Sequence, residues 1–249
     1  MQPASLNGKV IFITGGSRRV GAVVCRHLHA NGMNLVIHYR SSKDDAHALQ
    51  AELQQQRPDS VALLQADLLD YAHLETLVHD AAQAFGRLDV LLNNASSFYP
   101  TPVGQATEQQ WDELLGSNLK APFFLSQAAA PYLKRSAGCI VNIADVHAQR
   151  PLKNYPIYSA AKAGLVMLTQ SLARELGPEV RVNAIAPGTI LWPEHELDDA
   201  IKAQILERVP QKRSGEPMDI ARTVLFLIRD AHYISGQVIA VDGGRSVVA

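Results

Sequence analysis

The sequence predicts one α/β domain that spans residues 1–249 and contains a doubly wound parallel sheet with helices on both faces. Two observations support this fold class. Short apolar runs alternate with longer amphipathic stretches along the chain, and such alternation of strand and helix is typical of parallel sheets. The apolar runs are also unbroken and rich in β-branched residues, as expected of strands that are buried on both faces.

Apolar runs and helical periods define the individual elements. The predicted strands are Val10–Ile13, Leu35–Ile37, Val61–Leu64, Val90–Leu92, Ile140–Ile143, Val182–Ile185 and Val238–Val241. Helical periodicity is clearest in Asp44–Gln56, Tyr71–Phe85, Trp111–Leu133 with an interruption near Pro122, Tyr158–Leu176 and Asp219–Ile228. Residues 188–217 have no clear period, and because long loops in compact domains often cover binding sites, we expect this segment to select the substrate.

The charge balance and the cysteines exclude several classes of function. With 23 Lys and Arg against 24 Asp and Glu, the formal charge is -1, so no net field is available to hold a nucleic acid or a membrane surface. Cys25 and Cys139 have neither metal-ligand nor redox-pair spacing, so we expect reduced, buried thiols and no metal site. The absence of a leader-like or membrane-length apolar run predicts a cytoplasmic protein.

The first predicted strand leads directly into a glycine-rich turn, Thr14–Gly21, and then into a helix. Glycines in this position allow backbone N–H groups to approach a pyrophosphate at a helix N-terminus, whose dipole favours anions. The turn therefore predicts a dinucleotide site, with a merely tight structural turn as the alternative. Arg19 stands where a small residue is expected, so its long side chain could reach a phosphate or a substrate. The turn residues expected to contact the dinucleotide are Gly15, Ser17, Arg18, Arg19 and Val20.

The end of the second predicted strand bears on the choice between NAD and NADP. Tyr39, Arg40 and Ser41 offer no carboxylate for an adenosine 2′-hydroxyl, which an NAD site normally provides. A guanidinium with neighbouring hydroxyls suits a 2′-phosphate instead, through charge-assisted hydrogen bonds. We therefore expect NADPH to be preferred; the alternative is that Arg40 is a solvated loop charge, and Asp44 lies nearby.

The ends of the third and fourth predicted strands supply further cofactor candidates. Asp67, followed by Leu68, could accept a hydrogen bond from the adenine amino group or cap the following helix. The amides around Asn94 and Ala95 could hold the cofactor and the neighbouring backbone in place.

Tyr158 and Lys162 are four residues apart in a predicted helix, so their side chains share one face. An ammonium near a phenol favours the phenolate, and we expect Lys162 to bring the pKa of Tyr158 toward neutrality. Asp145 follows the fifth predicted strand, where open α/β sheets gather ligands. Asn118 lies inside a helical stretch, where Asn is unfavourable without a specific bond, which predicts a structural or proton-relay role. The four are candidate catalytic residues.

Together these motifs resemble the short-chain dehydrogenase/reductase family. The matching features, from about Lys9 to Arg245, are the glycine-rich turn, Asn93–Ala95, Asn118, Tyr158 with Lys162, Pro187–Gly188 and Val241–Gly244. The resemblance implies a Rossmann-type fold, cofactor contacts at Pro187 and Gly188, and hydride transfer from a nicotinamide. It further implies that Tyr158 donates a proton while Lys162 anchors the ribose and modulates that tyrosine.

Two departures from the general family pattern resemble its pteridine reductase branch. Arg19 replaces the middle glycine, and Asp145 stands where the family usually has a catalytic Ser. In that branch Phe98 would stack on a pterin opposite the nicotinamide, and Ser96 with Arg19 would bond the polar edge of the ring. Ordinary loop packing is the alternative for Phe98. The expected substrate contacts are Arg19, Ser96, Phe98, Asp145, Tyr158 and Trp192.

The resemblance therefore predicts NADPH-dependent reduction of dihydropterins, with oxidised pterins or dihydrofolate as further substrates. The hydride would go to a carbon of a C=N bond and Tyr158 would protonate the adjacent nitrogen. One alternative is a reductase of 3-oxoacyl thioesters or small ketones, which predicts a hydroxyl where Asp145 stands. Another is a catalytically silent dinucleotide sensor, against which the retention of Asn118, Tyr158 and Lys162 argues.

The remaining points concern the assembly of subunits and three further side chains. The resemblance implies a homotetramer, with the helical stretches Trp111–Leu133 and Tyr158–Leu176 in a subunit interface. The roles of Trp192 and His195 in the substrate segment are open. His147 could line the pocket or face solvent.

Overall fold

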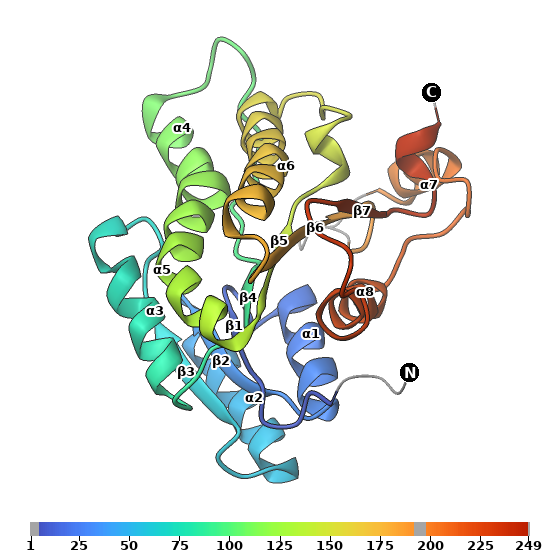
Figure 1. The fold of residues 1–249 in the computed structure, drawn as a ribbon. Helices are drawn as coiled ribbons and strands as arrows, with labels where there is room; N and C mark the ends of the chain where they lie inside the picture. The colour runs from blue at the N-terminus through green and yellow to red at the C-terminus, as the bar shows by residue number, and fades with distance from the viewer. Residues whose placement is uncertain (1–4, 192–197, 249) are drawn as a thin grey trace.

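The computed structural model describes residues 5–191 and 198–248, and within them seven parallel strands form one sheet in the order β3-β2-β1-β4-β5-β6-β7 (Figure 1). The strands are β1 (Val10–Ile13), β2 (Asn34–Tyr39), β3 (Val61–Gln65), β4 (Val90–Asn93), β5 (Cys139–Ile143), β6 (Arg181–Pro187) and β7 (Val238–Val241). All seven predicted strands are confirmed, with ends that differ by no more than a few residues.

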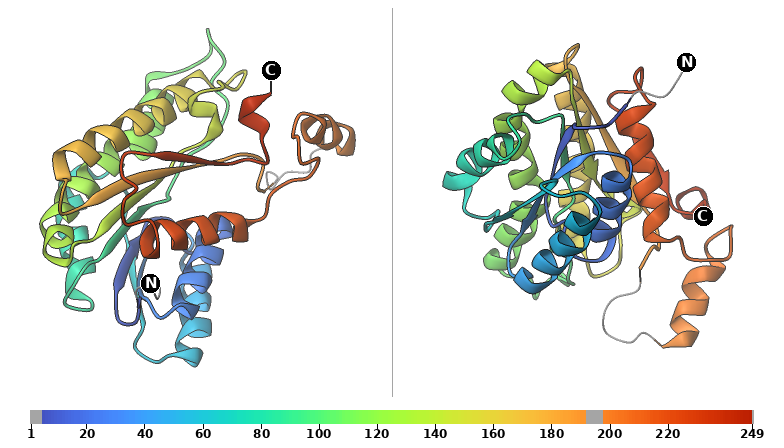
Figure 2. Two further views of the ribbon diagram at one scale, coloured as in Figure 1. Left: turned by 45° about the vertical axis from the view of Figure 1, so that its right-hand side comes forward. Right: turned by 90° about the horizontal axis from the view of Figure 1, so that it is seen from below.

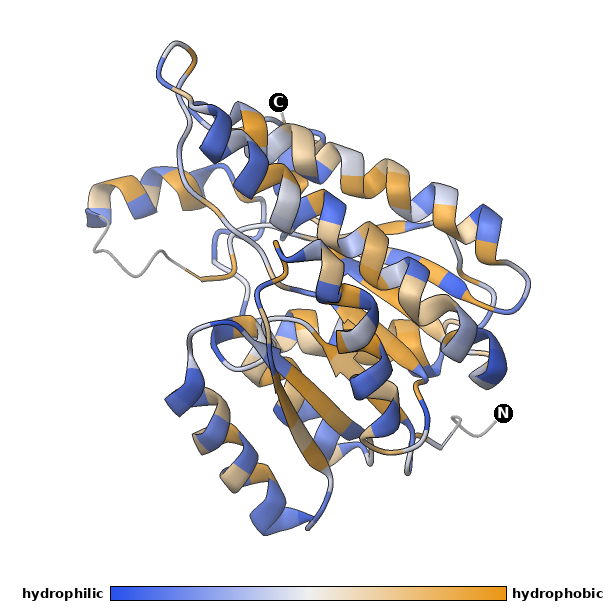
Figure 3. Ribbon diagram, turned by 90° about the vertical axis from the view of Figure 1, so that its left-hand side faces the viewer, coloured by the Kyte–Doolittle hydropathy of each residue, from blue (hydrophilic) through white to orange (hydrophobic). Residues whose placement is uncertain are grey.

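Helices cover both faces of the sheet, as predicted. On one face lie α1 (Arg19–Ala30), α2 (Lys43–Gln56) and α8 (Pro217–Arg229). On the other lie α3 (Leu74–Gln83), α5 (Ala121–Ser136) and α6 (Pro156–Leu176). Figure 3 shows largely hydrophobic strands between helices in which hydrophobic and hydrophilic residues alternate.

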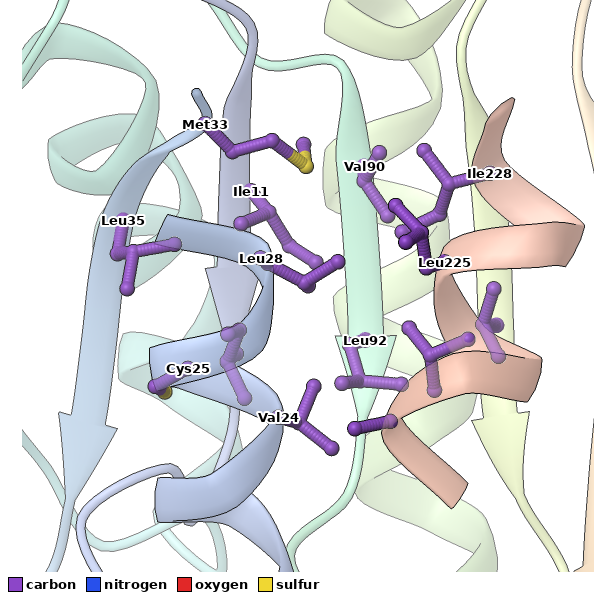
Figure 4. Packing of buried hydrophobic residues seen from close by; sticks show 14 of the residues in the cluster. Ile11, Val24, Cys25, Leu28, Met33, Leu35, Val90, Leu92, Leu225 and Ile228 are labelled. Carbon is purple, nitrogen blue, oxygen red and sulfur yellow. The ribbon is translucent and has the colours of Figure 1, made fainter. Parts of the chain in front are cut away.

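The core between α1, α8 and the sheet illustrates how helical periodicity becomes packing. Val24 and Leu28, one turn apart on α1, point toward the strands and are completely buried, as is Leu92 of β4 (Figure 4). Leu225 and Ile228 of α8 extend the same cluster. Each such side chain contributes roughly 1.5–3 kcal/mol when buried, so this layer holds the first turn of α1 firmly at the end of β1.

The helical stretch that was predicted over Trp111–Leu133 is divided differently from the prediction. Its interruption is a π-helical turn, Gly116–Lys120, between α4 (Glu108–Leu115) and α5. Pro122 does not break the helix, since it lies in the first turn of α5, where a backbone N–H needs no partner. The predicted helix Tyr71–Phe85 likewise begins with a 3-10 turn, Tyr71–His73, before α3.

Residues 188–217 were predicted to lack regular structure, yet they contain α7 (Asp199–Glu207). Figure 2 shows this helix set apart from the two helical layers. None of its residues is buried, so its sequence carries no apolar period from which it could be recognised. The ends of the segment approach each other, because Gly215 N–H donates to Thr189 O at 2.9 Å.

The topology gathers the strand ends that matter for function. β1 lies between β2 and β4, where the strand order reverses, and ligands of open α/β sheets bind outside the carboxyl ends at such a point. Cys25 and Cys139 are buried and unpaired, as predicted. Among the described residues, no helix combines the length and apolarity required to cross a bilayer.

Candidate active site

The glycine-rich turn between β1 and α1 is packed so closely that side chains are excluded. A Cβ on Gly15, whose φ is +60°, would lie 3.0 Å from Ala95 Cα, and one on Gly21 would lie 2.5 Å from Gly15 O. Asn94 Nδ2 donates to both Thr14 O and Gly15 O at 2.9 Å. The turn is therefore a fixed cradle of backbone at a helix N-terminus, which fits a pyrophosphate.

Two arginines stand at this helix start. Arg18 is the N-cap residue of α1 and makes no side-chain cap bond; its Nε lies 3.7 Å from Asp45 Oδ2 on α2. Arg19 has a φ of 51°, in the left-handed region, which costs a non-glycine residue roughly 1–2 kcal/mol. Such an outlier beside a cradle of this kind supports a functional role for its side chain.

The corner expected to bind a 2′-phosphate joins the same turn to the end of β2. Ser17 Oγ and Ser42 Oγ share a hydrogen bond of 2.7 Å, and Arg40 is an exposed residue that lines the adjoining cleft. Tyr39 is buried beneath this corner, with 5% of its surface exposed. The salt bridge between Arg18 and Asp45 at this corner was not predicted from the sequence.

The adenine side of the site is formed at the end of β3. Asp67 Oδ1 accepts from Leu69 N–H at 3.0 Å, so it closes a turn rather than capping a helix. Leu68 is buried beside it. His38 of β2 contacts both this region and the glycine-rich turn: Gly15 N–H lies 3.2 Å from His38 Nδ1, and His38 Nε2 lies 3.1 Å from Ala66 O. Sequence reasoning missed His38.

A single cleft of about 490 Å³ runs along these strand ends. Gly188, after β6, forms part of its wall, and a Cβ there would lie 2.6 Å from Asp242 Cβ. Of the predicted site residues, the cleft brings together Gly15, Arg18, Arg19, Val20, Arg40, Asp67, Leu68, Asn94, Ala95, Ser96, Asp145, Tyr158, Pro187 and Gly188. Those not on its wall are Ser17, Tyr39, Ser41, Phe98, Asn118 and Lys162. Trp192 and His195 lie outside the described residues.

Tyr158 and Asp145 lie together on the wall of the cleft. The Tyr158 hydroxyl donates to Asp145 Oδ2 at 2.7 Å, and Tyr158 is 4% exposed. Asp145 Oδ1 accepts from His147 N–H at 2.8 Å, so each carboxylate oxygen has its own partner and the side chain is fixed. The side chain of His147 bonds to Arg150 O and does not line this cleft.

The electrostatics of Tyr158 contradict the prediction that Lys162 brings its pKa toward neutrality. Burial raises the pKa of Tyr158 well above its usual value, and the Asp145 carboxylate raises it further. Lys162 Nζ donates to Ile143 O at 2.8 Å and is 5.7 Å from the centroid of the Tyr158 ring. Burial lowers the pKa of Lys162 to about 8, while Asp145 acts in the opposite direction. The carboxylate, which the spacing of Tyr158 and Lys162 does not reveal, dominates over the ammonium.

Asn118 occupies the π-helical turn, and its side chain is completely buried. Its Nδ2 donates to Leu114 O at 3.0 Å and to Ser97 O at 2.9 Å, and its Oδ1 accepts from Ser96 Oγ at 2.7 Å. Ser96 also contacts Tyr158, where a hydrogen bond opposes the rise in the pKa of the phenol. Asn118 therefore connects to Tyr158 through Ser96, and π turns of this kind often occur at functional sites.

Phe98 lies beside Tyr158, on the loop after β4. It stacks nearly parallel on Tyr155 with centroids 4.6 Å apart, and it meets Tyr158 edge-on at 4.8 Å. Because 48% of its surface is nonetheless exposed, Phe98 has a free aromatic surface next to the phenol of Tyr158. Sequence reasoning did not assign Tyr155 to the site, although it lies one turn before Tyr158.

The comparisons with known proteins agree with this arrangement. A family model described as Enoyl-(Acyl carrier protein) reductase matches residues 15–246. The chain belongs to the short-chain dehydrogenase/reductase family. It is therefore an NAD(P)-dependent oxidoreductase of that family, as the sequence predicted.

Three individual proteins show how far this similarity extends. The 3-oxoacyl-acyl-carrier-protein reductase of Staphylococcus aureus (strain Mu50 / ATCC 700699) is 38% identical over 240 residues, which are 95% of this chain and 97% of that protein. Pteridine reductase 1 of Leishmania tarentolae is 33% identical over 279 residues, with 96% of both chains covered. A blue fluorescent protein from a metagenomic library, crystallised in complex with NADPH, is 34% identical with a TM-score of 0.91, covering 97% of this chain and 99% of its own. Whole-chain similarity thus favours the 3-oxoacyl alternative over the pteridine reductase branch.

Proposed function

We propose that this protein is an NADPH-dependent pterin reductase. The observation that carries the proposal is the bond of 2.7 Å between Tyr158 and Asp145. A carboxylate at this position, where the family usually has a hydroxyl, gives the phenol a charged acceptor. A dihydropterin, whose ring edge carries several donors and acceptors, suits such a site better than a simple ketone does.

The cleft and the residues that adjoin it have the parts that NADPH requires. The backbone cradle at Gly15 and Gly21 suits the pyrophosphate, and Arg40 with the pair of Ser17 and Ser42 suits the 2′-phosphate. Lys162 would hold the nicotinamide ribose. When bound, the nicotinamide supplies the hydride.

The raised pKa of Tyr158 suits a proton donor. Because burial and Asp145 raise its pKa, Tyr158 keeps its proton at neutral pH and can transfer it to a ring nitrogen as the adjacent carbon receives the hydride. Phe98 offers an exposed aromatic surface beside Tyr158, and Arg19 and Ser96 offer polar contacts to the ring edge. Aromatic stacking together with a few fixed polar groups is the usual way to hold a planar heterocycle.

A second candidate, reduction of a 3-oxoacyl thioester, has one specific observation in its favour. The Staphylococcus relative named as a 3-oxoacyl reductase is 38% identical, against 33% for the Leishmania pteridine reductase. Those figures compare whole chains, whereas the bond between Tyr158 and Asp145 favours the pterin. We therefore rank the thioester second.

The deciding experiment measures NADPH oxidation with dihydrobiopterin, dihydromonapterin, dihydrofolate and acetoacetyl thioester offered separately. Turnover of a pterin, with little of the thioester, is the expected result, and NADH should be the poorer reductant. Turnover confined to the thioester would overturn the proposal. No turnover of any substrate, with NADPH still bound, would instead support a catalytically silent sensor.

A homotetramer is part of the same proposal. Trp111 on α4, Phe123 on α5 and Met167 on α6 are apolar side chains that are 51%, 37% and 63% exposed. They lie on the helical elements expected to form a subunit interface, where such surface would be buried. Sedimentation at micromolar concentration should show a tetramer, and a monomer would refute it.

A further inference from the structure

His38 lies beneath the cofactor cleft, and both of its ring nitrogens are bonded. It is a β2 residue with only 2% of its surface exposed. Gly15 N–H lies 3.2 Å from Nδ1, and Nε2 lies 3.1 Å from Ala66 O. Its backbone carbonyl also accepts from Gly16 N–H at 3.1 Å. One residue thus connects the β1–α1 turn with the end of β3.

The two ring partners fix the tautomer of His38. A backbone N–H can only donate and a carbonyl can only accept, so Nδ1 carries the lone pair and Nε2 carries the proton. Burial lowers the pKa of His38 to about 4; Ala66 and Asp67 oppose this shift, and Arg40 adds to it. The ring is therefore neutral near pH 7, and its part in the molecule is mechanical rather than acid–base.

The β1–α1 turn, which His38 holds on one side, is held on the other side by Asn94, which follows β4. Asn94 Nδ2 donates to Gly15 O at 2.9 Å, so the Gly15 residue is held by Asn94 at its carbonyl and by His38 at its N–H. Asp67 is the neighbour of Ala66, and Arg40 lies two residues after His38. All four of His38, Gly15, Arg40 and Asp67 line the same cleft.

We infer that His38 is a positioning residue that holds the pyrophosphate turn in register with the adenosine side of the cleft. The inference rests on the proposed binding of NADPH, but not on the proposed pterin. The acceptor at Nδ1 supplies the energy: without it, Gly15 N–H loses its partner and Gly15 keeps only the bond from Asn94. Loss of one hydrogen bond corresponds to about a tenfold weaker affinity for NADPH.

Two amide variants separate the two ring nitrogens. His38→Asn places a side-chain oxygen near the position of Nδ1 and can keep the bond to Gly15. His38→Gln places its amide near the position of Nε2 and can keep only the bond to Ala66. We expect the NADPH dissociation constant, measured by fluorescence titration without substrate, to rise about tenfold in the Gln variant and by less than about twofold in the Asn variant.

A matched control comes from a second buried histidine. His29 on α1 is 3% exposed, and its Nε2 bonds to Ser60 Oγ at 2.7 Å, away from the cleft. His29→Gln should lower the melting temperature of the cofactor-free protein without changing the affinity for NADPH. Equal affinities in wild type and both His38 variants, with only their melting temperatures lowered, would reduce His38 to a structural residue and overturn the inference. Equal weakening in both variants would overturn the assignment to Nδ1.

Amide exchange of Gly15, measured by NMR in the cofactor-free protein, tests the anchor independently of any ligand. Exchange should be faster in the Gln variant and close to wild type in the Asn variant; unchanged exchange in the Gln variant would contradict the inference. If wild type binds no NADPH, both the cofactor proposal and the role of His38 in it fail. If wild type binds NADPH but reduces no pterin, only the proposed substrate fails.

Discussion

Replacing Asp145 by Ser exchanges the carboxylate that is bonded to Tyr158 for the hydroxyl that is usual in the family. Asp145 spans two partners, Tyr158 at 2.7 Å and His147 N–H at 2.8 Å, and the single, shorter oxygen of Ser cannot serve both. Hydrogen bonds to a charged group contribute about 1.5–3 kcal/mol, so pterin turnover should fall by about 10- to 100-fold. The pKa of Tyr158 should also move down, because one of the causes that raise it is removed.

The assay compares kcat/KM for dihydrobiopterin and for acetoacetyl thioester in the same preparation. Asp145→Ser should lower kcat/KM for dihydrobiopterin. It should preserve or raise kcat/KM for acetoacetyl thioester, since a hydroxyl suits carbonyl reduction. Asp145→Asn, which keeps the shape but not the charge, should lower the pterin rate without a gain on the thioester. Pterin turnover in Asp145→Ser within about threefold of wild type would refute the argument, because the lost bond corresponds to at least about tenfold.

Three further predictions concern the rest of the cleft. Because the pKa of Lys162 is lowered to about 8, its positive charge is lost as the pH rises through that value. The value of kcat should therefore decline near pH 8. The Lys162→Arg variant keeps its charge, so its kcat should show no decline in a pH profile up to pH 9. Arg40→Asp should lower the affinity for NADPH by about 10- to 100-fold and raise the affinity for NADH. Parallel titrations of the two cofactors test this. Equal losses of affinity for both would argue against a contact between Arg40 and the 2′-phosphate. Gly21→Ala places a Cβ 2.5 Å from Gly15 O and should cost about 1–3 kcal/mol in urea unfolding, whereas unchanged stability would mean that the turn can relax.

Much of the fold was predictable because the strands carry their own signal. The run Val10–Ile13 is apolar at every position and is buried on both faces, so its composition suffices. The exposed α7 has no buried side and therefore no period to detect. The π turn around Asn118 depends on bonds to Leu114 and Ser97, and a sequence reveals only that such an Asn needs some partner.

The candidate site was predictable where chain order determines geometry. Asp145 follows a strand, Tyr158 lies on the next helix, and the structure brings the two side chains together. The pKa of Tyr158 could not be predicted, because its direction depends on burial and on the exact distances to Asp145 and Lys162. His38 was missed because its role depends on two backbone atoms that are distant in the chain, and no motif marks backbone partners.

The π-helical turn at Gly116–Lys120 also constrains the number of residues between α4 and α5. The N–H of Ala121 bonds to Gly116 O, five residues back, so the turn holds one residue more than an α-helix would. Deleting that residue would join α4 and α5 into one regular helix and rotate everything beyond it by about 100°. Leu125, Ala129 and Leu133, which are buried against the sheet, would swing toward solvent. Homologues that share Asn118 should therefore tolerate substitutions along this helical segment, from α4 through the π turn to α5, far more readily than a single-residue insertion or deletion.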